Sequence, residues 1–201
     1  NSSLKNYDFY NILGMPIGNE NSMITVSYFK WEIIFEKLEF NQLRSSQELY
    51  SIMNMNNCQQ VLISNMTMFF LRNLALIISQ SSFIYLKNSR IADFLARKGF
   101  DFTDSLLIIN ESVFSQIGVT PIFLTLANFN QGKLILEDFK LLNSFNPGFI
   151  FLNCEPLVFR KVLYQNVTIN NCSMITLTGT SIEMRNIDFL DMNITPPVSH
   201  I

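Results

Sequence analysis

A repeat of 23 to 28 residues constrains the fold of this chain more than any other feature of its sequence. Seven apolar reference residues mark the repeat: Phe35, Ile63, Leu86, Ile109, Leu136, Phe159 and Met184. The residues two before and five after each reference are also apolar, and so are those eight after, with Ser144 as the exception. A period of this length is typical of a solenoid, in which successive repeats stack and share one core.

Each repeat predicts two short strands joined by a tight bend, because apolar and polar residues alternate on both sides of one polar position. That position lies two residues after each reference and holds Lys37, Asn65, Asn88, Glu111, Asp138, Lys161 and Asn186. Asn and Asp tolerate the left-handed backbone conformation that such a bend needs. A third apolar run recurs at residues 23–26, 121–126, 149–152 and 174–177.

Three strands in each coil predict an all-β fold, a right-handed parallel β-helix of about seven coils over residues 23–195. Residues 1–22 are expected to form an N-terminal segment or cap of uncertain structure, and residues 196–201 a tail or a continuation into a longer chain. No polar cap is recognisable at either end. Because a solenoid exposes its last coil unless something covers it, we expect further chain or another subunit at one or both ends.

Two units carry a resemblance to a known family, Leu157-Val-Phe-Arg-Lys-Val-Leu-Tyr164 and Ile182-Glu-Met-Arg-Asn-Ile-Asp-Phe189. Over residues 23–195 the chain resembles the pectin-lyase-like superfamily of right-handed parallel β-helices, and more loosely its non-catalytic cell-surface repeat proteins. The resemblance implies a fold and no particular activity. The alternative is a leucine-rich-repeat solenoid, whose motif requires Asn or Cys where this chain has the apolar column from Leu43 to Met192.

The outward surface of one predicted strand is unusually apolar. The residue just before each reference points away from the core, and six of the seven such residues are apolar. If aligned, they form a strip of several hundred Å², as large as the largest apolar patch on most soluble monomers. We expect another chain, a copy of this one, or loops such as residues 94–103 or 1–22 to cover this strip: Ile34, Leu62, Tyr85, Ile108, Ile135 and Val158.

N-glycosylation sequons are more frequent than chance predicts, with six against roughly three. The excess indicates a secreted protein carrying N-glycans, with candidate sites at Asn1, Asn65, Asn110, Asn166, Asn171 and Asn193. Cys58, Cys154 and Cys172 are too few for a disulfide scaffold or a zinc site. Cys154 and Cys172 are the one pair close enough in sequence to suggest a disulfide.

No residue pattern points to catalysis, a cofactor or a metal. Glu111 and Asp138 share the bend position of neighbouring coils, which is compatible with a calcium site or a carboxylate pair, but Lys161 follows and favours a solvated charge ladder. The single histidine, His200, lies next to the last residue. A net charge of −2 without basic blocks argues against a nucleic-acid partner, and polar residues interrupt the longest apolar stretch, so we expect no membrane span.

The sequence therefore predicts a non-catalytic structural or adhesive module of an extracellular or cell-surface glycoprotein. It would assemble with other subunits or with copies of itself through the apolar strip and the open coil ends. The alternative is a carbohydrate-active enzyme, a polysaccharide lyase or glycoside hydrolase of β-helix type.

Overall fold

The structure, a computed structural model, describes residues 2–10, 22–44, 51–96, 98–119, 125–154, 157–170 and 173–195. These residues form strands joined by short corners, and the described part of the chain contains no helix. The strands are β1 (Ser2–Tyr10), β2 (Ser22–Ser27), β3 (Glu32–Asn41), β4 (Ser51–Asn56), β5 (Gln60–Ser64), β6 (Thr67–Arg72), β7 (Ala75–Gln80), β8 (Phe83–Lys87), β9 (Arg90–Ala96), β10 (Lys98–Thr103), β11 (Leu106–Asn110), β12 (Val113–Val119), β13 (Thr125–Asn130), β14 (Lys133–Phe145), β15 (Phe149–Leu152), β16 (Leu157–Asn170), β17 (Ile175–Thr178), β18 (Ile182–Leu190) and β19 (Asn193–Thr195).

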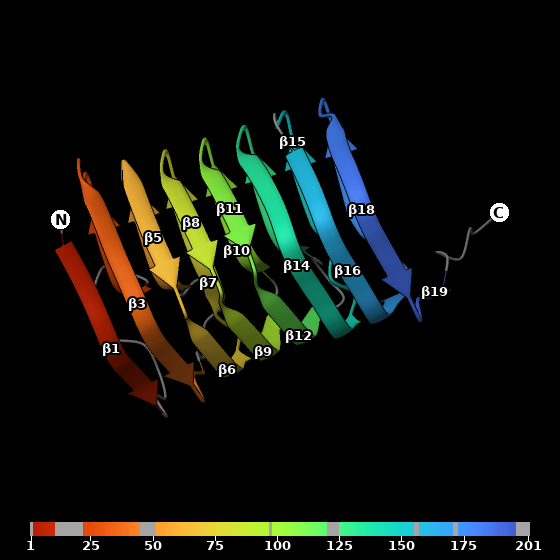
Figure 1. Cartoon of the computed structure of the whole chain (residues 1–201), viewed down its shortest axis with the longest axis horizontal. Coiled ribbons are helices and arrows are strands. Elements are labelled where there is room, and N and C mark those ends of the chain that lie inside the picture. The colour runs from red at the N-terminus through yellow and green to blue at the C-terminus, as the bar shows by residue number, and fades with distance from the viewer. Residues whose placement is uncertain are drawn as a thin grey trace.

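The strands stack in parallel, each on the equivalent strand of the next coil, which makes a right-handed β-solenoid (Figure 1). We name three faces. The first face consists of β5, β8 and β11 with the N-terminal halves of β1, β3, β14, β16 and β18, and the second of β6, β9 and β12 with the C-terminal halves of those five strands. The third face is a separate seven-stranded sheet, β2-β4-β7-β10-β13-β15-β17.

The predicted repeat is confirmed residue by residue in the strand register. Every reference residue pairs with the next along the first face, from Phe35 opposite Ile63 to Phe159 opposite Met184. The stack makes about six turns rather than the seven coils expected, because seven reference residues enclose only six complete repeats. The third sheet also argues against a leucine-rich repeat, since each coil contains a third strand.

Each coil turns three corners, and a residue in the left-handed region marks each corner. The predicted bend is the first corner, where φ lies between 46° and 56° at Lys37, Asn65, Asn88, Glu111, Asp138, Lys161 and Asn186. Two further corners were not predicted from the sequence. The second holds Gln42, Phe70, Asp93, Gln116, Asn143, Asn166 and Asp191, and the third holds Tyr28, Asn57, Ser81, Asp104, Gln131, Asn153 and Gly179. Asn, Asp and Gly are frequent here because their strain in this conformation is smallest.

The residue after a corner points inward, and where it carries a hydroxyl it links two coils. The Ser82 Oγ accepts a hydrogen bond from the Cys58 backbone N, 3.0 Å away in the preceding coil, and donates one to the Gln80 carbonyl at 3.0 Å. We call this arrangement a corner clip. The same pair of bonds recurs at Ser82, Ser89, Ser105, Ser112, Ser144 and Thr180.

The corner clip explains why Ser144 interrupts an otherwise apolar column. Its side chain is buried, and its Oγ accepts from the Ile117 backbone N at 3.2 Å and donates to the Leu142 carbonyl at 2.8 Å. The hydroxyl therefore both donates and accepts a hydrogen bond inside the core, so its burial costs little free energy.

Residues 94–103 and 1–22 were expected as possible covers for the apolar strip. Where the structure describes these two segments, they form strands of the stack itself. In residues 94–103, the side chains of Phe94, Phe100 and Phe102 are buried in the core, because β9 and β10 belong to the second and third faces. Within residues 1–22, β1 pairs with β3 in parallel, with Leu4 opposite Phe35, and so extends the stack at its N-terminal end.

Candidate interaction face

The six apolar residues predicted as an interaction strip form one continuous column on the first face. Ile34 pairs with Leu62, Leu62 with Tyr85, and the register continues through Ile108 and Ile135 to Val158. The first five are half-buried and Val158 is 9% exposed. The column thus presents a continuous row of apolar side chains.

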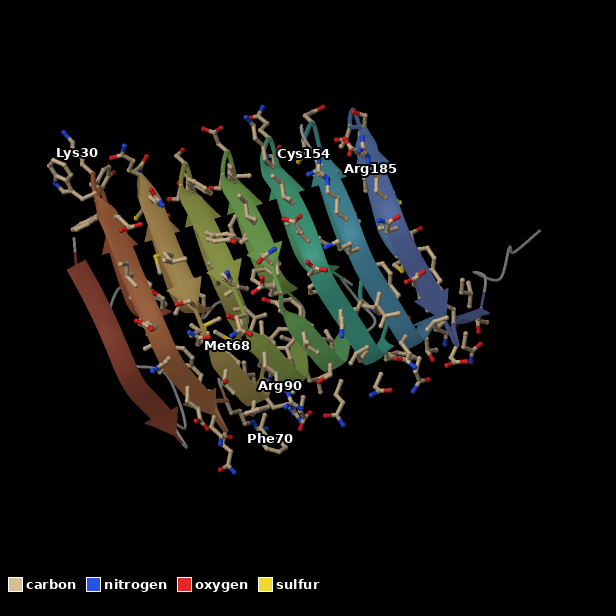
Figure 2. All side chains as sticks on the ribbon, in the orientation of Figure 1. Lys30, Met68, Phe70, Arg90, Cys154 and Arg185 are labelled. Carbon is tan, nitrogen blue, oxygen red and sulfur yellow. The ribbon has the colours of Figure 1, made fainter. Side chains whose placement is uncertain are left out.

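A second outward column flanks the strip, two residues further along each strand, and it is polar. It contains Glu36, Ser64, Lys87, Asn110, Glu137, Arg160 and Arg185 in register. Figure 2 shows Arg185 on β18 at the C-terminal end of this face. The flanking column was not predicted, although the residue one position after each reference is polar in every repeat and could have revealed it.

On the other side of the strip, two half-buried apolar residues widen the patch in the middle of the stack. Phe83 of β8 pairs with Leu106 of β11, two residues before Tyr85 and Ile108. Towards the ends of the same column lie polar residues, with Gln60 donating to Glu32 at 3.3 Å and Lys133 paired with Leu106. The apolar patch is therefore broadest at β8 and β11.

The sequons differ in how far the structure leaves them accessible. Asn65 and Asn166 are exposed corner residues, and Asn193 is exposed in β19. Asn110 is only 9% exposed, because it ends β11 on the first face and its Nδ2 lies 3.5 Å from the Glu137 Oε2. Asn1 and Asn171 lie outside the described residues.

The thiols of Cys58 and Cys154 are buried at equivalent positions after the third corner, where other coils carry Ser82, Ser105 or Thr180. The Cys58 Sγ lies 3.6 Å from the Asn56 carbonyl, which corresponds to the donated bond of a corner clip. Burial raises the pKa of the Cys58 thiol, so the neutral form is favoured. Cys172 lies outside the described residues, and its pairing with Cys154 stays a prediction.

The acidic residues of the first corner form exposed ion pairs. Asp138 Oδ2 lies 3.4 Å from Lys161 Nζ, and Glu111 Oε2 lies 3.6 Å from Lys87 Nζ. Among the described residues, no three His, Cys, Asp or Glu side chains gather as a metal site would require. His200 lies outside the described residues. The two ion pairs correspond to the solvated charge ladder favoured by the sequence.

The last described coil exposes residues that are core residues elsewhere. Met184 and Phe189 are 42% and 49% exposed, whereas Phe159 and Tyr164, which occupy the same positions one coil earlier, are fully buried. The sequence predicted an uncapped coil end, and β18 presents an apolar surface at the C-terminal end of the described stack.

Comparison with known proteins adds no assignment, because no protein-family model matches the chain and no curated protein is significantly similar to it. Where the structure describes the chain, it contains no helical segment with the length and hydropathy to cross a bilayer.

Proposed function

We propose that this chain is a non-catalytic structural or adhesive module of an extracellular or cell-surface glycoprotein. The module contributes a rigid rod whose first face packs against another protein surface, and its exposed coil end provides a second contact. We also propose membership of the pectin-lyase-like superfamily, supported by the three-strand coil and its parallel register.

The alignment of the apolar strip is the observation that carries this proposal. Outward positions on a solvated sheet are normally polar, yet here Leu62, Tyr85, Ile108 and Ile135 stand side by side. Phe83 and Leu106 extend the patch beside them. Contiguous apolar surface of this kind is typical of interaction sites.

The second face offers an internal comparison. The outward column at its centre contains Glu39, Thr67, Arg90, Val113, Lys140, Leu163 and Asp188, a mixture that suits solvent. Because both faces belong to the same coils and share one core, stability of the solenoid does not require an apolar outer column. The difference between the faces supports a role in binding for the first.

Replacing Leu62, Ile108 and Val158 together by Ser tests the role of the strip. In sedimentation velocity, the wild-type chain is expected to associate and the triple variant to sediment as a monomer. A matched control carries Thr67→Ser, Val113→Ser and Leu163→Ser on the second face and should behave as wild type. Equal sedimentation of all three proteins would contradict a binding role for the strip.

Glycan occupancy tests the extracellular part of the proposal. When the chain is produced through the secretory pathway of a eukaryotic cell, we expect its intact mass to fall after enzymatic removal of N-glycans. Asn65, Asn166 and Asn193 are the expected sites because they are exposed, and Asn→Gln substitution of each should remove one glycan. A mass that does not change on deglycosylation counts against a secreted glycoprotein.

A further inference from the structure

We propose that the partner of the first face is a second copy of this chain, packed face to face and antiparallel, with a two-fold axis through β11. This inference rests on the proposed function, since it names the occupant of the same apolar strip. It goes further by fixing the orientation of the two copies, their register and the residues that select both.

The symmetry follows from the shape of the face. A two-fold axis that lies in the interface and runs along the strands leaves each outward column opposite the same column of the other copy, but reverses the order of the coils. With the axis through β11, this strand meets its own copy, β8 meets β14, β5 meets β16, and β3 meets β18.

The flanking column is complementary to itself in this arrangement. Lys87 then faces Glu137, and by symmetry Glu137 faces Lys87; Ser64 faces Arg160. At the ends of the column, Glu36 faces Arg185. No pair of like charges meets along the column, and the two neutral Asn110 side chains meet at the axis.

Moving the axis by one strand in either direction brings like charges together. Moving the axis to β8 sets Lys87 against Lys87 and Glu36 against Glu137. Moving it to β14 sets Glu137 against Glu137 and Lys87 against Arg185. Because juxtaposed like charges disfavour an interface strongly, the order of charges along the column favours an axis at β11 over one at β8 or β14.

Parallel packing is also disfavoured. An axis along the length of the solenoid would place the flanking column of one copy opposite the column on the far side of the strip, so that Glu36 would face Glu32 and Lys87 would face the ring of Phe83. The antiparallel arrangement avoids the pair of Glu36 with Glu32, and it places Phe83 of one copy opposite Lys133 of the other.

The strip and Leu106 beside it have the same symmetry as the charges. Ile108 and Leu106 each meet their own copy at the axis, Tyr85 meets Ile135, and Leu62 meets Val158. The broadest part of the patch, at β8 and β11, lies at or next to the axis. Glu183, the one acidic residue in the strip column, falls at the edge opposite Ile34.

The area of the first face is sufficient for a dimer of modest affinity. Seven strands at a spacing of about 4.8 Å and five residues at a rise of about 3.3 Å describe a face of roughly 29 Å by 17 Å. Two such faces bury roughly 1,000 Å², which is about the lower limit for a specific protein interface.

Lys87 and Glu137, the central pair, are held only loosely within the chain. Lys87 Nζ lies 3.6 Å from Glu111 Oε2, and both side chains are about half exposed. Glu137 Oε2 lies 3.5 Å from the Asn110 amide. Such weak exposed contacts leave both groups able to pair across an interface.

One of the glycosylation sequons lies in the proposed interface. Asn110 lies at the two-fold axis, so a glycan on this sequon and the antiparallel dimer exclude each other. Its low exposure is compatible with an unoccupied site, and secreted chain that dimerises should carry no glycan at Asn110.

Charge reversal at the central pair tests the inference. In sedimentation equilibrium on unglycosylated chain at low salt, wild type should dimerise. Lys87→Glu and Glu137→Lys should each weaken the dimer about tenfold or more, because each places like charges opposite each other twice. The double variant K87E/E137K restores opposite charges and should recover most of the wild-type affinity. As a matched control, the double reversal D138K/K161E at the first corner should leave dimerisation unchanged.

Three results would overturn the antiparallel dimer: a wild-type chain that stays monomeric at its highest soluble concentration, single reversals that do not weaken association, or a double reversal that fails to restore it. Failure of the proposed function is recognised separately. If the Leu62, Ile108 and Val158 triple variant loses association while the charge reversals have no effect, the strip is a binding face and only the antiparallel pairing is wrong. Melting temperatures of all variants exclude unfolding as the cause.

Discussion

The ring of Tyr164 stacks on the ring of Phe189 in the next coil, with 5.2 Å between their centroids and 8° between their planes. Tyr164 is fully buried and Phe189 is half exposed, so this pair joins the core to the open coil end. The Tyr164 hydroxyl is buried without a hydrogen-bond partner. A buried hydroxyl without a partner destabilises the folded state, because water solvated it in the unfolded chain.

Replacing Tyr164 by Phe is therefore expected to raise the free energy of unfolding by about 1 kcal/mol, since the ring stacking stays and the unsatisfied hydroxyl is removed. Urea denaturation monitored by circular dichroism measures the change. A loss of stability in Y164F would show that the hydroxyl has a partner in solution.

The same burial raises the pKa of Tyr164 above its ordinary value of 10.0. A group whose pKa is higher in the folded state stabilises the fold below the unfolded pKa and loses that contribution as the pH rises. Wild-type stability should thus decline above about pH 10, and Y164F should decline less. Parallel stability curves for the two proteins over this range would contradict the assignment.

The corner clips predict that replacing Ser82 by Ala destabilises the fold much more than replacing the adjacent Ser81 by Ala. Ser82→Ala removes the acceptor for the buried Cys58 backbone N and should cost about 1 to 3 kcal/mol. Ser81→Ala is the matched control, because the Ser81 hydroxyl is exposed and reaches only Asp104, at 3.3 Å; its effect should stay within about 0.5 kcal/mol. Equal effects of the two substitutions in urea denaturation would be inconsistent with the clip.

Phe70 is the one residue in the second corner column that is neither Asn, Asp nor Gln. Its φ is 53° and its ring is 51% exposed, so it bears the strain of the left-handed conformation with little burial in return; Figure 2 shows it projecting from the edge of the stack near Arg90. We expect Phe70→Asn to stabilise the chain by about 1 kcal/mol. Phe70→Ala removes the same ring without supplying an Asn and should give a smaller gain in thermal denaturation. A destabilised F70N would indicate that the ring contributes packing.

Columns of apolar residues were sufficient to predict the coils, the first corner and the position of the strip. A side chain's direction follows from local alternation, so Ile108 could be placed outward before the coils were stacked. The role of Ser144 could not be predicted, because its partner Ile117 lies in another coil and becomes adjacent only through stacking. For the same reason, the burial of Asn110 depends on Glu137 in the next coil and is invisible to a sequon pattern.

The third face was only partly predicted. Residues 23–26, 149–152 and 174–177 were recognised as strands because their apolar runs are short, and they correspond to β2, β15 and β17. Of the fourth predicted run, 121–126, residues 121–124 lie outside the described residues. β4, β7 and β10 were missed. Residues 51–56 contain two Asn, and residues 98–103 contain Lys and Asp among their apolar residues. Where a strand is interrupted in this way, alternation alone gives too weak a signal.

The stacking of coils in register is the claim on which every surface assignment depends. Distances between spin labels at first-corner residues measure it directly, with Asn186→Cys paired in turn with Lys37→Cys, Asn65→Cys and Asn88→Cys in a Cys172→Ser background. These pairs span six, five and four coils, so the account predicts distances near 29, 24 and 19 Å that fall by about 4.8 Å per coil. Distances that do not fall in equal steps, or that exceed this spacing severalfold, would contradict the solenoid and the aligned face with it.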